Sequence, residues 1–280
     1  MGFEILTYGF MQKALVSGIA IALMCSVVGL FLVLRRHSLF GDALAHSAFG
    51  GIAAGLYLGI YPLWTAFVVS ISSALVLAKI KQKFDISGDA TVAMLLSSGL
   101  AMGVILISIA RGFTVDIFSF LFGSILLVSL QNTLLILGIC ASILTIILLL
   151  YRQLMHTTFN EEQAQVSGIP VGSLNYLFVV IAAITVVSSM QLVGILLTSS
   201  LIVIPNVTAI LFSRGFKQTI ILSMSFAVSS AIIGILTSYV FNVAPGGMIV
   251  FISIIVFGVS LGLKSLRKSR FGKKSVIITS

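Results

Sequence analysis

The stretch LRRHSLFGDALAHSAFGGIAAG, from Leu34 to Gly55, decides how the rest of this 280-residue chain is interpreted. It places Asp42 and His46 four residues apart in a segment that is otherwise mostly apolar and rich in glycine. Residues at positions i and i+4 share one face of a helix, so the carboxylate and the imidazole are expected side by side. Ionisable side chains inside a hydrophobic helix are costly, which makes this pair a candidate functional site.

The composition assigns the chain to the membrane. Hydrophobic residues make up 59% of the sequence and charged residues 8%, with a mean hydropathy of +1.23. Soluble domains have about 25% charged residues. The apolar runs continue for about 20 residues, the length of a helix that crosses a bilayer, and do not alternate as the strands of a membrane barrel would. We therefore predict an all-α polytopic membrane protein, placed in the cell membrane.

The apolar runs predict nine spans, with a tenth, shorter piece at 117–130 that does not cross. Eight crossings remain possible if the first or second segment is interfacial or re-entrant. The predicted spans are 14–34, 41–61, 62–78, 91–110, 133–151, 173–189, 192–212, 219–241 and 247–263.

The basic residues set the orientation. With an external N-terminus, 14 of the 16 Lys and Arg residues fall on one side, and only Lys13 and Arg111 fall opposite. Cytoplasmic loops carry this excess, so the C-terminus is predicted to be cytoplasmic. A single transmembrane domain is expected over 1–263, with a basic tail at 264–280. The net charge of +9 is explained by this topology and does not indicate nucleic-acid binding, because no soluble basic domain is long enough.

The pair Asp42 and His46 allows three interpretations. A carboxylate and an imidazole form a half-site for Zn²⁺ or Mn²⁺. The same groups suit a proton relay. They could also satisfy each other, or a backbone carbonyl, as a buried polar staple. At about 100° per residue, Gly51, Gly55 and Gly59 form a small-residue ridge on the opposite face, where another helix can approach closely.

A cytoplasmic loop at 152–172 contains the segment NEEQAQVSGIP. Asn160 is a candidate N-cap, Glu161 and Glu162 lie in the first turn, where the helix dipole favours them, and Gly168 ends the helix. Such a helix is either a docking element for another protein or a solvated connector.

The seventh predicted span contains a proline among polar residues. Pro205 inside the helix frees a backbone carbonyl and bends it. The polar neighbours either line a pore or join helices by hydrogen bonds. The candidates for this pathway or gating helix are Thr198, Ser199, Pro205 and Asn206.

The motifs together resemble the permease subunits of ABC-type zinc and manganese importers. LRRHSLFGDALAHSAFGG is similar to the family's GDAxxHA pattern after a basic end of the first span. FNEEQAQVSGIPVGSLNYLF is similar to its FDEExAxxxGIP loop, and FLFGSIL and LVGILLTSSLIVIPNVTAILF match two further segments. The sequence departs from the family at Gly50, at Asn206 and in APGGMIV before the last span.

The resemblance implies a permease homodimer with two cytoplasmic ABC ATPase subunits and an extracytoplasmic metal-binding protein. It implies that Asp42 and His46 lie in the translocation pathway of a Zn²⁺ or Mn²⁺ ion, with no permanently bound cofactor. It also implies a coupling helix that fits a cleft on the ATPase and involves Asn160, Glu161, Glu162, Ala164 and Gly168.

The expected function is thus ATP-driven import of a divalent metal by a subunit that is not itself an enzyme. The sequence contains no GxxxxGK[ST] phosphate loop, so a separate partner must hydrolyse ATP. Two alternatives remain, a proton-coupled secondary carrier and an ABC permease for a metal chelate such as a siderophore. One carboxylate and one imidazole suit several divalent metals, so the pair predicts no choice between them.

Overall fold

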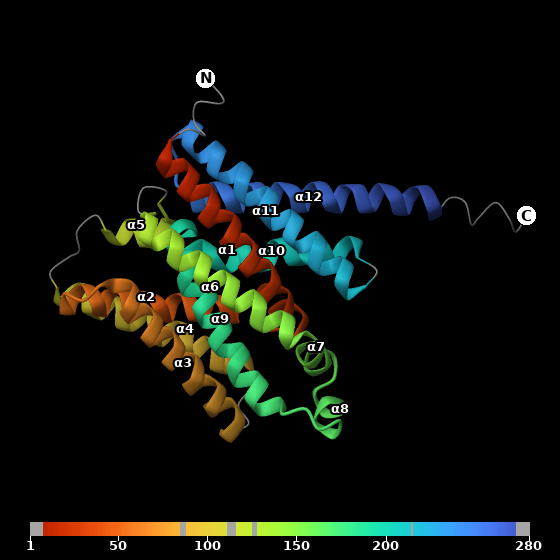
Figure 1. The fold of residues 1–280 in the computed structure, drawn as a ribbon, viewed down its shortest axis with the longest axis horizontal. Coiled ribbons are helices and arrows are strands. Elements are labelled where there is room, and N and C mark those ends of the chain that lie inside the picture. The colour runs from red at the N-terminus through yellow and green to blue at the C-terminus, as the bar shows by residue number, and fades with distance from the viewer. Residues whose placement is uncertain (1–7, 85–87, 111–115, 125–127, 214, 273–280) are drawn as a thin grey trace, which may run out of the picture.

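The computed structural model describes residues 8–84, 88–110, 116–124, 128–213 and 215–272, and every regular element in these ranges is a helix (Figure 1). The first six are α1 (Gly9–Leu34), α2 (Phe40–Leu58), α3 (Pro62–Phe84), α4 (Gly88–Ile109), α5 (Asp116–Phe122) and α6 (Leu130–Leu149). The others are α7 (Tyr151–Phe159), α8 (Glu161–Val166), α9 (Val171–Val193), α10 (Ile195–Phe212), α11 (Phe216–Phe241) and α12 (Pro245–Gly272).

All nine predicted spans coincide with helices, which confirms the all-α membrane fold. Eight of the described helices are long and apolar enough to cross a membrane. The ninth, α2, has 19 residues but includes Asp42 and His46, and it does not meet the same criteria. It nevertheless packs mainly against α3 and α4 and lies within the bundle. Within the described residues of the piece at 117–130, the helix α5 (Asp116–Phe122) has seven residues, too few to span, as predicted.

Burial separates central helices from peripheral ones. In α1 and α9, 78% and 72% of the most apolar window is buried, against 22–28% in α3, α4, α6 and α12. The four peripheral helices therefore present most of their surface to lipid or to other subunits. The centre of the protomer is built around α1 and α9.

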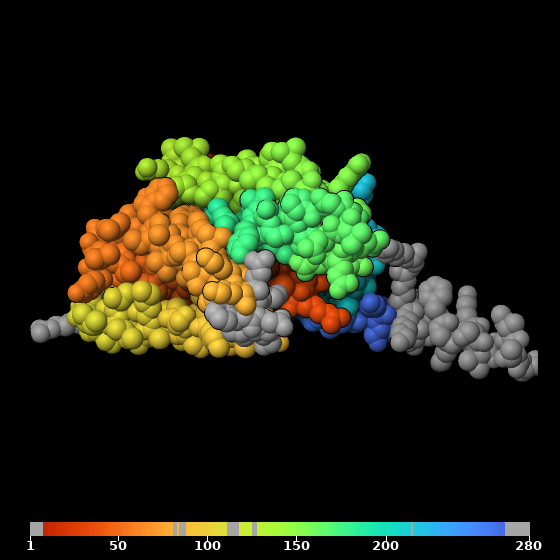
Figure 2. All heavy atoms as spheres, turned by 90° about the horizontal axis from the view of Figure 1, so that it is seen from below, coloured from red at the N-terminus to blue at the C-terminus, as the bar shows by residue number. Residues whose placement is uncertain are grey.

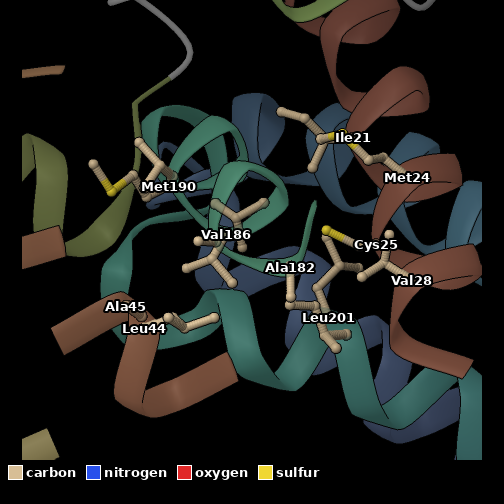
Figure 3. Close-up of a cluster of buried hydrophobic side chains, with 14 of the residues drawn as sticks. Ile21, Met24, Cys25, Val28, Leu44, Ala45, Ala182, Val186, Met190 and Leu201 are labelled. Atoms are coloured by element: carbon tan, nitrogen blue, oxygen red, sulfur yellow. The ribbon is translucent and has the colours of Figure 1, made fainter. Parts of the chain in front are cut away.

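Side chains of α1, α2, α9 and α10 meet in this centre (Figure 3). Cys25 from α1 lies near Ala182 from α9 and Leu201 from α10, and Leu44 reaches the same cluster from α2. All four side chains are fully buried. The core thus fixes one face of α2 toward the interior.

Three glycines allow a close backbone crossing where α5, the α9–α10 turn and α12 meet. Gly123 and Gly194 have φ angles of 78° and 90°, in the left-handed region that favours glycine. A Cβ atom at Gly123 would lie 2.2 Å from the carbonyl oxygen of Leu192, and one at Gly246 would lie 1.7 Å from that of Val193. No larger residue fits at these points without a shift of the backbone.

The last helix extends beyond the predicted span. α12 continues to Gly272 and projects past the rest of the bundle (Figure 1). The first part of the predicted basic tail is therefore helical, and its last residues, 273–280, lie outside the described ranges.

Candidate functional site

Asp42 and His46 occupy the one open strip on the first part of α2. From Phe40 to Ala53, every residue except these two is buried, and both are partly exposed. Their spacing of four residues puts them on the same face. The helix therefore presents an aspartate and a histidine together on a face that the rest of the chain covers only in part.

The opposite face of α2 packs closely on α3. A Cβ atom at Gly51 would lie 2.7 Å from the Cα of Ala66, and one at Gly55 would lie 2.9 Å from the Cα of Pro62. These two positions of the predicted ridge thus lie at a close approach of two helices. Gly59 does not: it ends α2 in the left-handed conformation, with a φ of 69°, and a Cβ atom there would meet no described atom within 4 Å. Its role is to terminate the helix, because the chain must turn there into α3.

A second close contact, with α4, supports the turn that carries His46. A Cβ atom at Gly99 would lie 2.6 Å from the backbone nitrogen of Ser47 and 2.7 Å from the carbonyl oxygen of His46. One turn along, a Cβ atom at Gly103 would lie 2.5 Å from the ring of Phe49. α3, α4 and the core together hold α2 on all sides except the strip of Asp42 and His46.

The imidazole of His46 has an unused nitrogen. Its Nδ1 atom is buried and has no hydrogen-bond partner among the described residues. A buried polar atom without a partner costs about 1–3 kcal/mol. A polar staple would have supplied that partner, so this observation speaks against the staple interpretation. An imidazole nitrogen is also an ordinary ligand of divalent metals.

The described residues of the chain do not by themselves form a metal site. Among the residues that the structure describes, no group of three His, Cys, Asp or Glu side chains is placed to hold an ion. Asp42 and His46 can supply two ligands, and metals of this class bind four or more. Asp42 and His46 alone are therefore fewer than the ligands that a complete site of this class needs.

Most of the candidate residues on the predicted pathway or gating helix are buried inside the bundle. Pro205 lies inside α10, and it is buried together with Thr198 and Asn206, while Ser199 is partly exposed. The amide of Asn206 donates to the carbonyl oxygen of Ile202 at 2.6 Å and accepts from the hydroxyl of Ser223 on α11 at 2.5 Å. Of the two interpretations of these residues, this geometry matches hydrogen bonding between helices.

The segment around Glu161 forms the short helix α8. The side chain of Asn160 accepts from the backbone N–H of Gln163 at 2.9 Å, as an N-cap does, and Gly168 follows the helix with a φ of 79°. Ala164 is 2% exposed and anchors α8, whereas the other residues from Glu161 to Gly168 are exposed. α8 thus offers an acidic, mostly exposed surface at the end of the bundle.

A polar cluster around Arg35 ties the end of α1 to this region. The Arg35 guanidinium donates to the hydroxyls of Thr157 and Thr158 and to the side-chain oxygen of Asn175, at 3.0, 3.1 and 2.8 Å. It also lies 4.7 Å from the centre of the Phe178 ring. Burial lowers the pKa of Arg35 from its ordinary value, and the charge of Glu161 opposes this shift.

The interpretation of the sequence missed this cluster. Arg35 appeared only as a basic residue that sets topology. Its partners lie more than 120 residues away along the chain, so no local pattern connects them.

Comparison with known proteins identifies the group to which this arrangement belongs. The sequence pattern of the ABC 3 transport family matches residues 7–264, nearly the whole chain. The chain belongs to the ABC 3 transport family. It is therefore a multi-pass membrane protein of the permease type, and the resemblance found in its motifs is confirmed.

Relatives of this ABC 3 family chain include named manganese permeases. It is 33% identical to the manganese transport system membrane protein MntC of Halalkalibacterium halodurans, over 92% of this chain and 88% of the relative. It is 34% identical to the manganese import system permease protein ScaB of Streptococcus gordonii, over 96% of each chain. The fold matches PsaBC from Streptococcus pneumoniae, solved in complex with Fab, with a TM-score of 0.82 and 34% identity over 92% of this chain and 93% of that one.

Proposed function

We propose that this chain is the membrane-spanning subunit of an ATP-driven importer of a divalent metal, and that the metal is Mn²⁺. The observation that carries the proposal is the open strip of α2, where Asp42 and His46 are the two uncovered residues between Phe40 and Ala53. The names of the relatives MntC and ScaB support manganese as the cargo. Membership of an ABC transport family favours this function over a proton-coupled carrier.

The pathway is completed by a second copy of the chain. Within the part of the chain that the structure describes, one copy offers a carboxylate and an imidazole, which are too few ligands to bind an ion by themselves. Two copies that face each other across their open strips would supply two of each. Oxygen and imidazole ligands together suit Mn²⁺. Partial coordination as the ion arrives, followed by release, is what a transport site requires.

ATP hydrolysis takes place on a separate subunit that docks at α8. Glu161 and Glu162 are exposed on this helix, and Val166 is 90% exposed. Ala164 faces inward, and the left-handed Gly168 lets the chain return to α9. This combination suits insertion of α8 into a cleft of the partner. An extracytoplasmic binding protein delivers the ion to the opposite end, with the N-terminus outside and the C-terminus in the cytoplasm.

In this mechanism the ion moves because its exposure changes. Closure of the ATPase pair displaces α8, and the helices switch between outward and inward access to Asp42 and His46. No covalent step occurs in this chain.

The proposal is tested by uptake into vesicles that contain the permease with its ATPase. We expect Asp42→Ala and His46→Ala each to abolish ATP-dependent Mn²⁺ uptake, because each removes half of the ligands that a protomer supplies. His156→Ala and Asp89→Asn are matched controls, since both residues are exposed on other helices. Uptake that proceeds without ATP would contradict the importer. Preferred uptake of Zn²⁺ over Mn²⁺ would contradict only the choice of metal.

A further inference from the structure

The side chain of Arg35, at the end of α1, contacts both helices that flank α8 in the chain, α7 and α9. Three of its nitrogen atoms donate to three different residues, Thr157 and Thr158 on α7 and Asn175 on α9. α7 ends one residue before the N-cap of α8, and α9 begins shortly after α8 ends. The guanidinium therefore binds to both α7 and α9, the helices that precede and follow α8 in the chain.

Asn175 extends the connection to α8 itself. Its side-chain oxygen accepts from Arg35 at 2.8 Å, and its side-chain nitrogen donates to a carboxylate oxygen of Glu161 at 2.7 Å. Glu161 is the first residue of α8. A chain of two hydrogen bonds thus runs from α8 to the end of α1. Figure 2 shows this side of the molecule, where green atoms, from the part of the chain that includes α7 to α9, lie close to red-orange atoms from the N-terminal part.

Arg35 is joined to α2 by a short, hydrogen-bonded connection. The backbone N–H groups of Arg36 and His37 donate to Val33 and Leu32 at 3.1 and 2.9 Å, which closes α1 with a Schellman motif. The N–H of Phe40, the first residue of α2, then donates to His37 at 3.1 Å. Asp42 lies in the first turn of α2, so a displacement of Arg35 can reach it through a short, hydrogen-bonded backbone segment.

Space for movement exists beside this cluster. A cavity of about 900 Å³ lies between α8 and α9 on one side and α3 and α4 on the other. Arg35 and Asn175 form part of its wall, together with Glu162 of α8 and Thr91 of α4. Among the described residues, α8 can therefore be displaced toward α3 and α4 without first breaking a packed interface.

We infer that Arg35 is a positioning residue that transmits the displacement of α8 to α2 and so to Asp42 and His46. The inference rests on the proposed function, because it needs an ATPase that moves α8. An arginine suits the task, since its planar group presents five donors in a fixed fork and can hold two helices at once. A lysine presents a single charged centre and cannot reproduce this geometry.

The test measures coupling in the complete complex with its ATPase subunits. We expect Arg35→Ala to lower the amount of Mn²⁺ moved per ATP hydrolysed by about tenfold or more, the equivalent of one charge-assisted hydrogen bond. ATPase subunits should still copurify, and the nucleotide-free complex should bind Mn²⁺ as before. Arg35→Lys should also lower the amount of Mn²⁺ moved per ATP hydrolysed, but by less than Arg35→Ala does. Arg36→Ala is the matched control, because Arg36 is the exposed neighbour on the same turn.

A second variant keeps the test decisive if Arg35→Ala does not assemble. Asn175→Ala cuts the link to Glu161 but leaves the contacts of Arg35 with α7 in place, and it should show the same loss of coupling. The inference is overturned if the variants transport Mn²⁺ with the normal ratio to ATP, or if both lose assembly and Mn²⁺ binding together with transport. Failure of the unaltered complex to take up Mn²⁺ would instead overturn the proposed function.

Discussion

His46 shows how a single residue on this chain departs from ordinary packing. The buried Nδ1 atom has no hydrogen-bond partner in the described structure, although nearly every neighbour on α2 is buried in close contact. The sequence predicted which residues share this face, because i and i+4 geometry is local. It could not predict that the nitrogen would lack a partner, since that depends on every helix packed around α2.

Asn206 is the opposite case. From the sequence, this polar residue could either line a pore or join two helices by hydrogen bonds. The structure places it beside Gly29 of α1, with both ends of its amide hydrogen-bonded. A lone polar residue in an apolar run has the same pattern in either role. Only the position of α11, which supplies Ser223, separates the two.

We therefore expect Asn206→Leu to reduce stability and to leave the transport mechanism intact. The change leaves the hydroxyl of Ser223 without its partner, at a cost of about 1–3 kcal/mol. Thermal unfolding in detergent should show the loss, whereas Mn²⁺ uptake per folded complex should stay near that of the unaltered protein. Loss of uptake at normal thermal stability would contradict this expectation and would indicate that Asn206 lines the transport pathway.

At the scale of elements, the crossing of α5, the α9–α10 turn and α12 explains why three positions there are glycine. The sequence motifs alone give no reason for these glycines. Gly123, Gly194 and Gly246 lie far apart in the sequence but meet within backbone contact. Hydropathy located every long helix, although α3 and α12 run six and nine residues past their predicted ends, because it reports on each apolar segment separately. The crossing depends on contacts between segments that are distant along the chain, which periodicity cannot reveal.

Gly246→Ala should therefore be strongly destabilising. A Cβ atom there meets the carbonyl oxygen of Val193, a backbone atom that cannot rotate away. Overpacking costs about 1–3 kcal/mol and can cost more where backbone must move. Gly138→Ala on α6 is the control, because no described atom lies within 4 Å of the added methyl group. Equal thermal stability of the two variants would contradict this expectation, because it would show that the backbone at the crossing shifts at little cost to accept the methyl group.

On the scale of the whole molecule, the described part of the chain forms a packed bundle, and within it no group of three His, Cys, Asp or Glu side chains is placed to hold an ion. Its centre, around α1 and α9, is closed by apolar side chains, while Asp42 and His46 on α2 are partly exposed. The sequence predicted the bundle because membrane helices are encoded by runs of apolar residues. It predicted the second copy only through the family resemblance, since symmetry between chains leaves no local pattern.

If two copies share one site, the purified permease should bind one Mn²⁺ ion per two chains, and both open strips should be needed. A complex assembled from one unaltered copy and one Asp42→Ala copy should then lose most of its uptake, because every site contains the altered chain. Independent sites would instead retain about half of the uptake and bind one ion per chain. Mixed complexes, purified through different affinity tags on the two copies, distinguish the two arrangements by uptake and by the ratio of bound Mn²⁺ to protein.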